Sequence, residues 1–363
     1  MALDTGVGRE RRILETFVRV TLIVDSHAHY TTAPPQLDAY RARQLGSLNR
    51  PTAGAAPKFS DDELLESLQG HLRRMDKFGI DRMIFSPRAS GMGHEIGDAR
   101  VSLYWTRVNN ELIKRVCDLV SDRFIPAAQL PQSPGVSPAS CVDELTRCVN
   151  ELGFVGCNIN PDVAGGGQPF TPAISDEWWY PLWEAMEGLE VPGLIHASST
   201  VNPALHLNGS HYTNADAAVT FELCWSDVYD RHPDLKLIVP HGGGSLPFNW
   251  NRHRALHIQK AKPAFEERVK NVYFDTAIYD RDSMEMLIRK VGADNILYAS
   301  EPFGTAKAVD PNTNRPFDDT VSFVNDIQWL SAEERTKIFI GNVRKLYPRA
   351  ALPVGATAAT ATG

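Results

Sequence analysis

Eight short apolar runs recur along this chain, and most are followed by a loop and then by a segment with helical periodicity. Runs that are apolar on both faces indicate parallel strands that helices cover on both sides. Eight such units predict an α/β fold of the (β/α)8 type, the TIM barrel. The runs occupy residues 21–24, 81–87, 124–130, 154–160, 193–196, 235–241, 272–276 and 295–301.

A doubly wound open sheet is the alternative architecture, but no glycine-rich phosphate loop follows the first run. One barrel is therefore expected over residues 21–350, with an N-terminal extension at 1–20 and a disordered tail at 351–363. Within the barrel, a long proline-rich loop is expected at 31–60. A capping box at Ser60 and Glu63 predicts a helix that runs to Phe78.

Composition narrows the classes of function. The 363 residues are 43% hydrophobic and carry a net charge of −7 without any basic run, so a nucleic-acid partner is not expected. No apolar stretch is long enough to cross a membrane. The five cysteines form no CxxC pair, which favours a reducing, cytoplasmic location. An anionic substrate would have to be held by a few local arginines or by a metal.

Polar side chains gather where the predicted strands end. His27 and His29 follow the first run, and residues two apart on a strand point to the same face. His196, His241 and Glu301 close the fifth, sixth and eighth runs. Active sites of such barrels lie at the carboxyl ends of the strands. A hydrogen-bonded core histidine would explain one member of the pair, but not five residues at four strand ends.

These residues predict a centre for one divalent metal ion. Three imidazoles with one carboxylate suit Zn²⁺ best, and Mn²⁺ or Fe²⁺ also accept such ligands. The expected ligands are His27, His29, His196 and Glu301, and a bound water would complete the site. His241 is expected to be a free base beside three glycines, although the pattern also allows a fifth ligand or a supporting histidine.

The same pattern resembles the amidohydrolase superfamily, in particular its branch of decarboxylases and hydratases related to aminocarboxymuconate-semialdehyde decarboxylase. That branch usually has Asp after the eighth strand, whereas Glu301 resembles the narrower group of 4-oxalomesaconate hydratases. The resemblance covers residues 22–350. It rests on DSHAHYTTAP at 25–34, FSPRAS at 85–90, LPQSPGV at 130–136, NINPD at 158–162, GSHYTNAD at 209–216, PHGGG at 240–244, and on Ser300-Glu301 with the acidic residues at 310, 318 and 319.

The resemblance implies a metal-dependent hydratase that converts 4-oxalomesaconate to 4-carboxy-4-hydroxy-2-oxoadipate in the catabolism of aromatic acids. It also implies a homodimer. The chain departs from the family pattern in its N-terminal extension, at 91–95 and at Pro302-Phe303. Alternative functions are a non-oxidative decarboxylase of an aromatic or muconate-type acid, a hydrolase of a lactone or C–C bond, and an inactive barrel used as a scaffold.

Hydration of a conjugated C=C bond needs clamps for carboxylates and a proton donor. Arg88 and Arg252 are the expected clamps, because a guanidinium forms paired hydrogen bonds with a carboxylate. Glu301 and His241 are expected to steer the attacking water. His241 or Tyr212 would deliver the proton, and the role of Tyr212, in a polar loop, is implied by the resemblance. The amides expected to bind substrate oxygens belong to Asn160 and Asn214.

Overall fold

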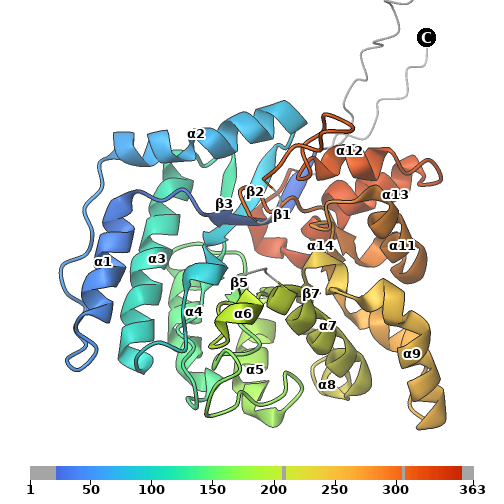
Figure 1. Cartoon of the computed structure of the whole chain (residues 1–363), viewed down its shortest axis with the longest axis horizontal. Coiled ribbons are helices and arrows are strands. Elements are labelled where there is room, and N and C mark those ends of the chain that lie inside the picture. The colour runs from blue at the N-terminus through green and yellow to red at the C-terminus, as the bar shows by residue number, and fades with distance from the viewer. Residues whose placement is uncertain (1–21, 207–209, 305–306, 354–363) are drawn as a thin grey trace, which may run out of the picture.

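The strands run side by side in one direction around the middle of the molecule, in their order along the chain (Figure 1). The computed structural model describes residues 22–206, 210–304 and 307–353. Every strand pair in it is parallel. The strands are β1 (Val24–Tyr30), β2 (Arg82–Pro87), β3 (Phe124–Pro126), β4 (Ala128–Gln129), β5 (Cys157–Ile159), β6 (Gly193–Ile195), β7 (Leu237–Val239), β8 (Tyr273–Asp275) and β9 (Ile296–Leu297).

All eight predicted runs contain strands, and the third contains two. β3 pairs with β2 and β4 pairs with β5, so the hydrogen-bonded ladders form one sheet of three strands and one of six. Ala127 joins the two halves, because its N–H donates to the carbonyl of Phe85 at 2.9 Å. At the other seam, the N–H of Ser26 donates to the carbonyl of Tyr298 at 2.9 Å, which links β1 to the end of the last run. The arrangement is that of a (β/α)8 barrel.

The first strand is longer than its apolar run. β1 spans Val24–Tyr30 and is buried at all seven positions, so His27 and His29 lie within the strand and not beyond its end. Thr21, where the predicted run begins, lies outside the described residues. The apolar pattern did not predict this extension because the added residues are mostly polar. They can be buried because they form hydrogen bonds inside the protein: Asp25 accepts hydrogen bonds from the N–H groups of His27 and Ser300.

Helices surround the strands (Figure 1). The helix predicted after the capping box is present as α2: Ser60 caps its start, and Gly79, in the left-handed conformation, follows its last residue. The α-helices are α1 (Pro35–Leu45), α2 (Asp61–Phe78), α3 (Ala99–Leu119), α4 (Val142–Asn150), α5 (Tyr180–Leu189), α6 (Pro203–His206), α7 (Ser210–Trp225), α8 (Val228–Arg231), α9 (Leu246–Gln259), α10 (Phe265–Arg268), α11 (Arg281–Val291), α12 (Thr320–Asn325), α13 (Ala332–Thr336) and α14 (Asn342–Leu346).

Two segments expected to be loops contain helices. The proline-rich stretch at 31–60 includes α1, which starts with Pro35 in its first turn, where a missing N–H costs nothing, and buries Leu37 and Tyr40. The polar motif at 209–216 lies largely in α7, whose buried face includes Asp216, Val219 and Leu223. In both cases few buried side chains per turn suffice once tertiary packing supports the helix.

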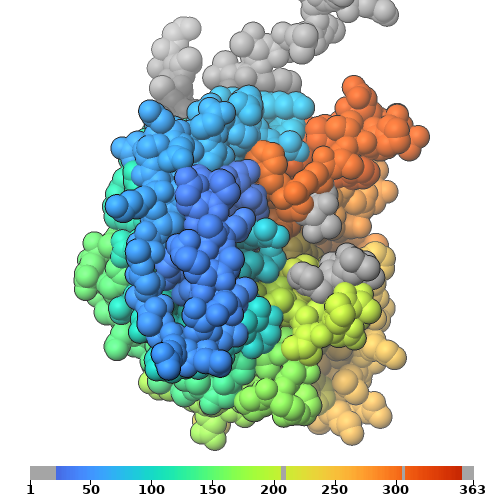
Figure 2. All heavy atoms as spheres, turned by 60° about the vertical axis from the view of Figure 1, so that its left-hand side comes forward, coloured from blue at the N-terminus to red at the C-terminus, as the bar shows by residue number. Residues whose placement is uncertain are grey.

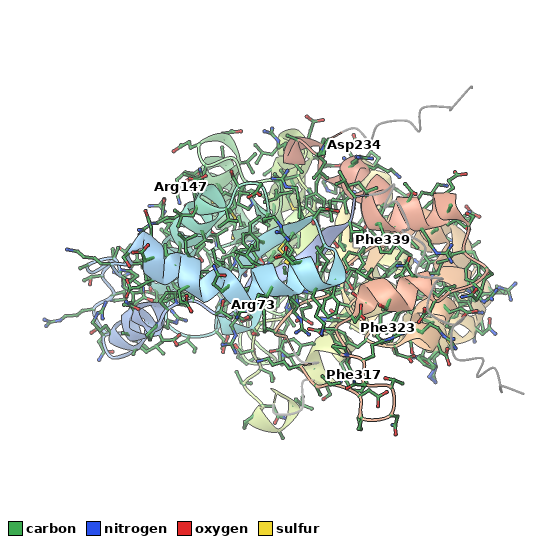
Figure 3. All side chains as sticks on the ribbon, turned by 90° about the horizontal axis from the view of Figure 1, so that it is seen from above. Arg73, Arg147, Asp234, Phe317, Phe323 and Phe339 are labelled. Carbon is green, nitrogen blue, oxygen red and sulfur yellow. The ribbon has the colours of Figure 1, made fainter. Side chains whose placement is uncertain are left out.

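The inside of the barrel is filled at its amino-terminal end by one cluster of buried side chains. Val24, Ile84, Leu194 and Leu297 come from four different strands and meet in it. Val343 and Leu346 of α14, together with Tyr347, close this end. Seen from above, α2 with Arg73 lies beside the C-terminal helical region, where Phe323 and Phe339 are labelled (Figure 3).

The predicted extension at 1–20 lies outside the described residues, as does the predicted tail apart from residues 351–353. Among the helices described, none combines the length and apolar character that crossing a membrane requires.

The capping box provides a test of the fold. Ser60 accepts the N–H of Glu63 at 3.1 Å, and Glu63 accepts the N–H of Ser60 at 2.8 Å. We expect Ser60→Ala to lower the free energy of unfolding by about 1 kcal/mol, measured by urea denaturation. The control is Ser47→Ala at an exposed serine outside the helices. Equal stability of the two variants would contradict the assigned cap.

Candidate metal centre

Four side chains converge at the carboxyl end of the barrel. His27 and His29 lie on β1, His196 follows β6 directly, and Glu301 ends the last of the eight runs. One ligand atom from each residue lies within 4.8 Å of every other. The three histidines are buried and Glu301 is nearly so. The spacing on β1 thus places two imidazoles on one face, and the barrel brings the other two groups to meet them.

Hydrogen bonds at the outer ring nitrogens orient all three imidazoles. Nδ1 of His27 lies 2.8 Å from Oδ2 of Asp275, and Nδ1 of His196 lies 2.7 Å from the carbonyl oxygen of Ala197. Nδ1 of His29 lies 2.8 Å from Oγ of Ser86. A carboxylate and a carbonyl only accept, so Nδ1 of His27 and of His196 carries the hydrogen. Their Nε2 lone pairs therefore point inward, as metal coordination requires.

The inner nitrogens fit a cation. Nε2 of His27 and Nε2 of His29 are only 3.0 Å apart, so two lone pairs face each other unless one ring is protonated there. Nε2 of His196 is buried and has no hydrogen-bond partner in the part of the chain that the structure describes. A divalent ion between these nitrogens and the Glu301 carboxylate would satisfy all of them.

Electrostatics favour the protonation states that ligands need. Burial, together with the rings of His196 and His27, holds the pKa of His29 well below its ordinary value. Burial alone would raise the pKa of Glu301, but its interactions with His196 and His241 hold that pKa well below the usual range. The site therefore presents a neutral imidazole and an ionised carboxylate near neutral pH.

Glu301 is held in a turn with unusual backbone angles. Its φ is 43° and that of Phe303 is 62°, both in the left-handed region that non-glycine residues avoid. Such conformations cost of order 1–3 kcal/mol each and persist only where surrounding contacts enforce them. The N–H of Glu301 donates to the carbonyl of His27 at 3.1 Å, which fixes the start of the turn against β1.

Tyr279 also contacts this carboxylate. Its hydroxyl donates to Oε2 of Glu301, and its own φ is 65°. Tyr279 lies in the loop after β8 and lines the same cavity as the proposed ligands. The sequence analysis missed it, although its position four residues past a strand end on the catalytic side was an available signal.

His241 lies beside the ligands in a pair with a buried acid. Its Nδ1 is 2.8 Å from Oδ2 of Asp216, and its Nε2 is 3.5 Å from Oε2 of Glu301. Burial would lower the pKa of His241, but Asp216 and Glu301 together hold it well above the ordinary value. Asp216 lies on α7 and was not identified as a functional residue from the sequence, although it ends the polar motif at 209–216. The pair can hold a proton next to the cavity.

A cavity of about 570 Å³ opens above the four side chains. Arg88 and Lys307 contribute cations to its wall, and Tyr212 contributes a phenol. Burial raises the pKa of Tyr212, an effect that contact with Ser90 and the nearby Arg88 oppose. The ring centroid of Tyr212 lies 5.8 Å from that of His196. The remaining lining residues include Thr31, Thr213, Ala277, Ile278, Pro302, Phe303 and Gly304.

Three residues nominated for substrate binding do not line this cavity. Asn160 is fully buried and accepts the N–H of Asp162, while its amide nitrogen lies 3.2 Å from Nδ1 of His94. Its side chain therefore supports the loop after β5. Asn214 and Arg252 are exposed on α7 and α9. Each lies within a helix well past the end of the preceding strand, and neither contributes to the wall of the cavity.

Comparison with known proteins finds relatives of two kinds, hydratases and decarboxylases. The 2-keto-4-carboxy-3-hexenedioate hydratase of Sphingobium sp. (strain NBRC 103272 / SYK-6) is 40% identical over 90% of this chain and 96% of its own length. The γ-resorcylate decarboxylase of Rhizobium sp. (strain MTP-10005) is 28% identical over 78% of this chain and 88% of its own length.

Solved structures agree with this placement. The crystal structure of 4-oxalomesaconate hydratase from Rhodopseudomonas palustris matches with a TM-score of 0.83 and 40% identity, covering 90% of this chain and 96% of that one. The 2,6-dihydroxybenzoate decarboxylase from Rhizobium matches with a TM-score of 0.67 at 24% identity over 90% and 99% of the two chains, which supports the fold alone. A family model described as amidohydrolase matches residues 24–349. The chain belongs to the amidohydrolase family.

Proposed function

We propose that this chain is a metal-dependent hydratase that adds water to 4-oxalomesaconate, giving 4-carboxy-4-hydroxy-2-oxoadipate. The observation that carries the proposal is a three-histidine, one-glutamate cluster at the base of a cavity that Arg88 and Lys307 line with positive charge. Support comes from two relatives, each 40% identical over 90% of the chain, that are named as hydratases of unsaturated keto acids.

We propose His27, His29, His196 and Glu301 as the ligands of one divalent ion, with Zn²⁺ favoured and Mn²⁺ as the alternative. When bound, such an ion acts as a Lewis acid that activates water near neutral pH. The outer nitrogens of the three imidazoles are hydrogen-bonded to Asp275, Ser86 and the carbonyl of Ala197, and these contacts hold the rings in place.

The other residues of the cavity supply binding and proton transfer. Arg88 has no ion-pair partner among the described residues and can clamp a substrate carboxylate through paired hydrogen bonds. Lys307 offers a second positive charge to a substrate with three carboxylates. We assign proton donation to the carbon next to the carbonyl to Tyr212, which lines the cavity, and we assign uptake and return of a proton to the Asp216–His241 pair.

Decarboxylation of an aromatic acid is the less favoured alternative. The γ-resorcylate decarboxylases of Rhizobium, Polaromonas and Rhodococcus are 27–29% identical to this chain, against 40% for the hydratase of Sphingobium. Glu301 in place of the usual Asp also favours hydration. A homodimer in the cytoplasm remains our proposal for the assembly and its location, with a small anionic carboxylate as its partner molecule.

The metal centre is tested by metal analysis of purified protein. We expect about one divalent ion per chain, and loss of that ion in His196→Ala, because a ligand with an otherwise unpartnered nitrogen is removed. His253→Ala, which removes a histidine of α9 outside the site, is the control. Equal metal content in both variants would rule out this ligand set.

The reaction is tested with 4-oxalomesaconate alongside a panel of aromatic acids. We expect loss of the enone absorbance without release of CO₂, and abolition of the reaction by chelation or by Glu301→Ala, which removes the carboxylate ligand. Release of CO₂ from an aromatic acid, without hydration of the keto acid, would establish the decarboxylase instead.

The carboxylate clamp is tested by Arg88→Met. Losing hydrogen bonds to a charged group costs roughly 1.5–3 kcal/mol, so kcat/KM should fall about 10- to 100-fold. Arg50→Met, at an exposed arginine outside the cavity, should have no effect. An unchanged kcat/KM in Arg88→Met would remove this residue from the substrate site.

A further inference from the structure

Gly70 is an unexpected residue in the interior of α2, because glycine weakens a helix there. The space beside it is occupied. A Cβ atom added to Gly70 would lie 3.0 Å from Cζ of Phe303, closer than carbon atoms normally approach. Phe303 belongs to the turn that carries Glu301, more than two hundred residues away in sequence. The missing side chain of Gly70 therefore makes room for this ring.

Two more residues of α2, His71 and Arg74, also contact the Phe303 ring, and together with Gly70 they form what we call the seat of this ring. His71 meets it edge to face, with ring centroids 4.7 Å apart and an interplanar angle of 75°. The guanidinium of Arg74 lies 5.5 Å from the ring centroid, and Arg74 itself forms an ion pair with Asp318. The segment after β9, coloured orange, accordingly lies against α2 in Figure 2.

His71 acts in this seat as an apolar ring. It is fully buried, and neither ring nitrogen has a hydrogen-bond partner in the described structure. Burial, with a smaller contribution from Arg74, lowers the pKa of His71 to about 3, so the ring is neutral at physiological pH. Its other aromatic neighbours are Phe85 and Phe124, which join the seat to the core.

The turn connects the Phe303 ring to the Glu301 carboxylate. Both residues have left-handed backbone angles, and the chain doubles back between them. A Cβ atom at Gly304 would lie 2.8 Å from Cδ of Glu301, so the far side of the turn packs directly on the carboxylate. Phe303 also lines the cavity beside Glu301. We therefore expect a shift of the ring to be passed through this short turn to the carboxylate.

We propose that Phe303 is a positioning residue whose ring, seated on Gly70, His71 and Arg74 of α2, sets the place of Glu301 in the metal centre. The inference rests on the proposed function only in taking Glu301 as a metal ligand. It gives Gly70 and Phe303 a joint role that neither has alone: helix α2, which contributes no ligand, determines the geometry of one.

Gly70→Ala separates this role from a structural one. Alanine favours the helix, so the Tm should stay the same or rise. The added methyl group should displace Phe303, and both the affinity for Zn²⁺, measured by chelator competition, and kcat should fall about tenfold or more. Gly188→Ala is the matched control, since Gly188 lies in α5 with nothing within 4 Å of an added Cβ atom. It should leave both quantities unchanged.

Phe303→Leu and the double variant Gly70→Ala/Phe303→Leu complete a mutant cycle. Phe303→Leu alone should also weaken Zn²⁺ binding, and the double variant should bind Zn²⁺ more tightly than either single variant, because the methyl group then fills the vacated space. Wild-type Zn²⁺ affinity in either single variant, or no recovery in the double variant, would overturn the proposal. Zn²⁺ affinity needs no turnover, so a failure of the hydratase assay leaves this test intact.

Discussion

The inward-facing lone pairs of three buried imidazoles are the constraint on which this site depends. Two of the nitrogens, on His27 and His29, lie 3.0 Å apart, and a third, on His196, has no partner among the described groups. Such an arrangement is unfavourable without a cation. The fold enforces it from outside through Asp275, Ser86 and the carbonyl of Ala197, each at an outer nitrogen. Asp275 also accepts a hydrogen bond from the backbone N–H of His241. One carboxylate on β8 therefore orients both His27 on β1 and His241 after β7.

The proposed ligands are held in two different ways, the histidines by strands and Glu301 by a turn. The histidines lie on or directly beyond strands, where the barrel ladder fixes the backbone. Glu301 instead lies on a turn with strained angles, and the turn is held by Tyr279, by the backbone of β1 and by the ring of Phe303 on α2. Strain of this kind is retained where a side chain must be presented in one orientation. A carboxylate on this turn can be shifted by the loop sequence without changing the barrel.

Sequence reasoning located the strands and the convergent residues because both depend on patterns that the barrel repeats. Buried parallel strands require apolar runs, and a site at their carboxyl ends requires polar residues just there. The same reasoning missed Asp275, Asp216 and Tyr279. Asp275 and Tyr279 lie at or just after the end of β8, and Asp216 ends a polar motif, but such positions do not show which side chain each residue contacts. The fold decides that, as with the 248 positions between His27 and Asp275. Asn160 shows the converse: a polar residue near a strand end can be buried and hydrogen-bonded within the protein instead of lining the cavity.

The most direct test of the account is a crystal structure of the protein grown with Zn²⁺, with the ion located by its anomalous scattering. We expect one ion bound by Nε2 of His27, His29 and His196 and by a carboxylate oxygen of Glu301, with distances of about 2.0–2.2 Å. The outer hydrogen bond from His27 to Asp275 should be unchanged. An ion elsewhere, or one that leaves Glu301 unbound, would contradict the account.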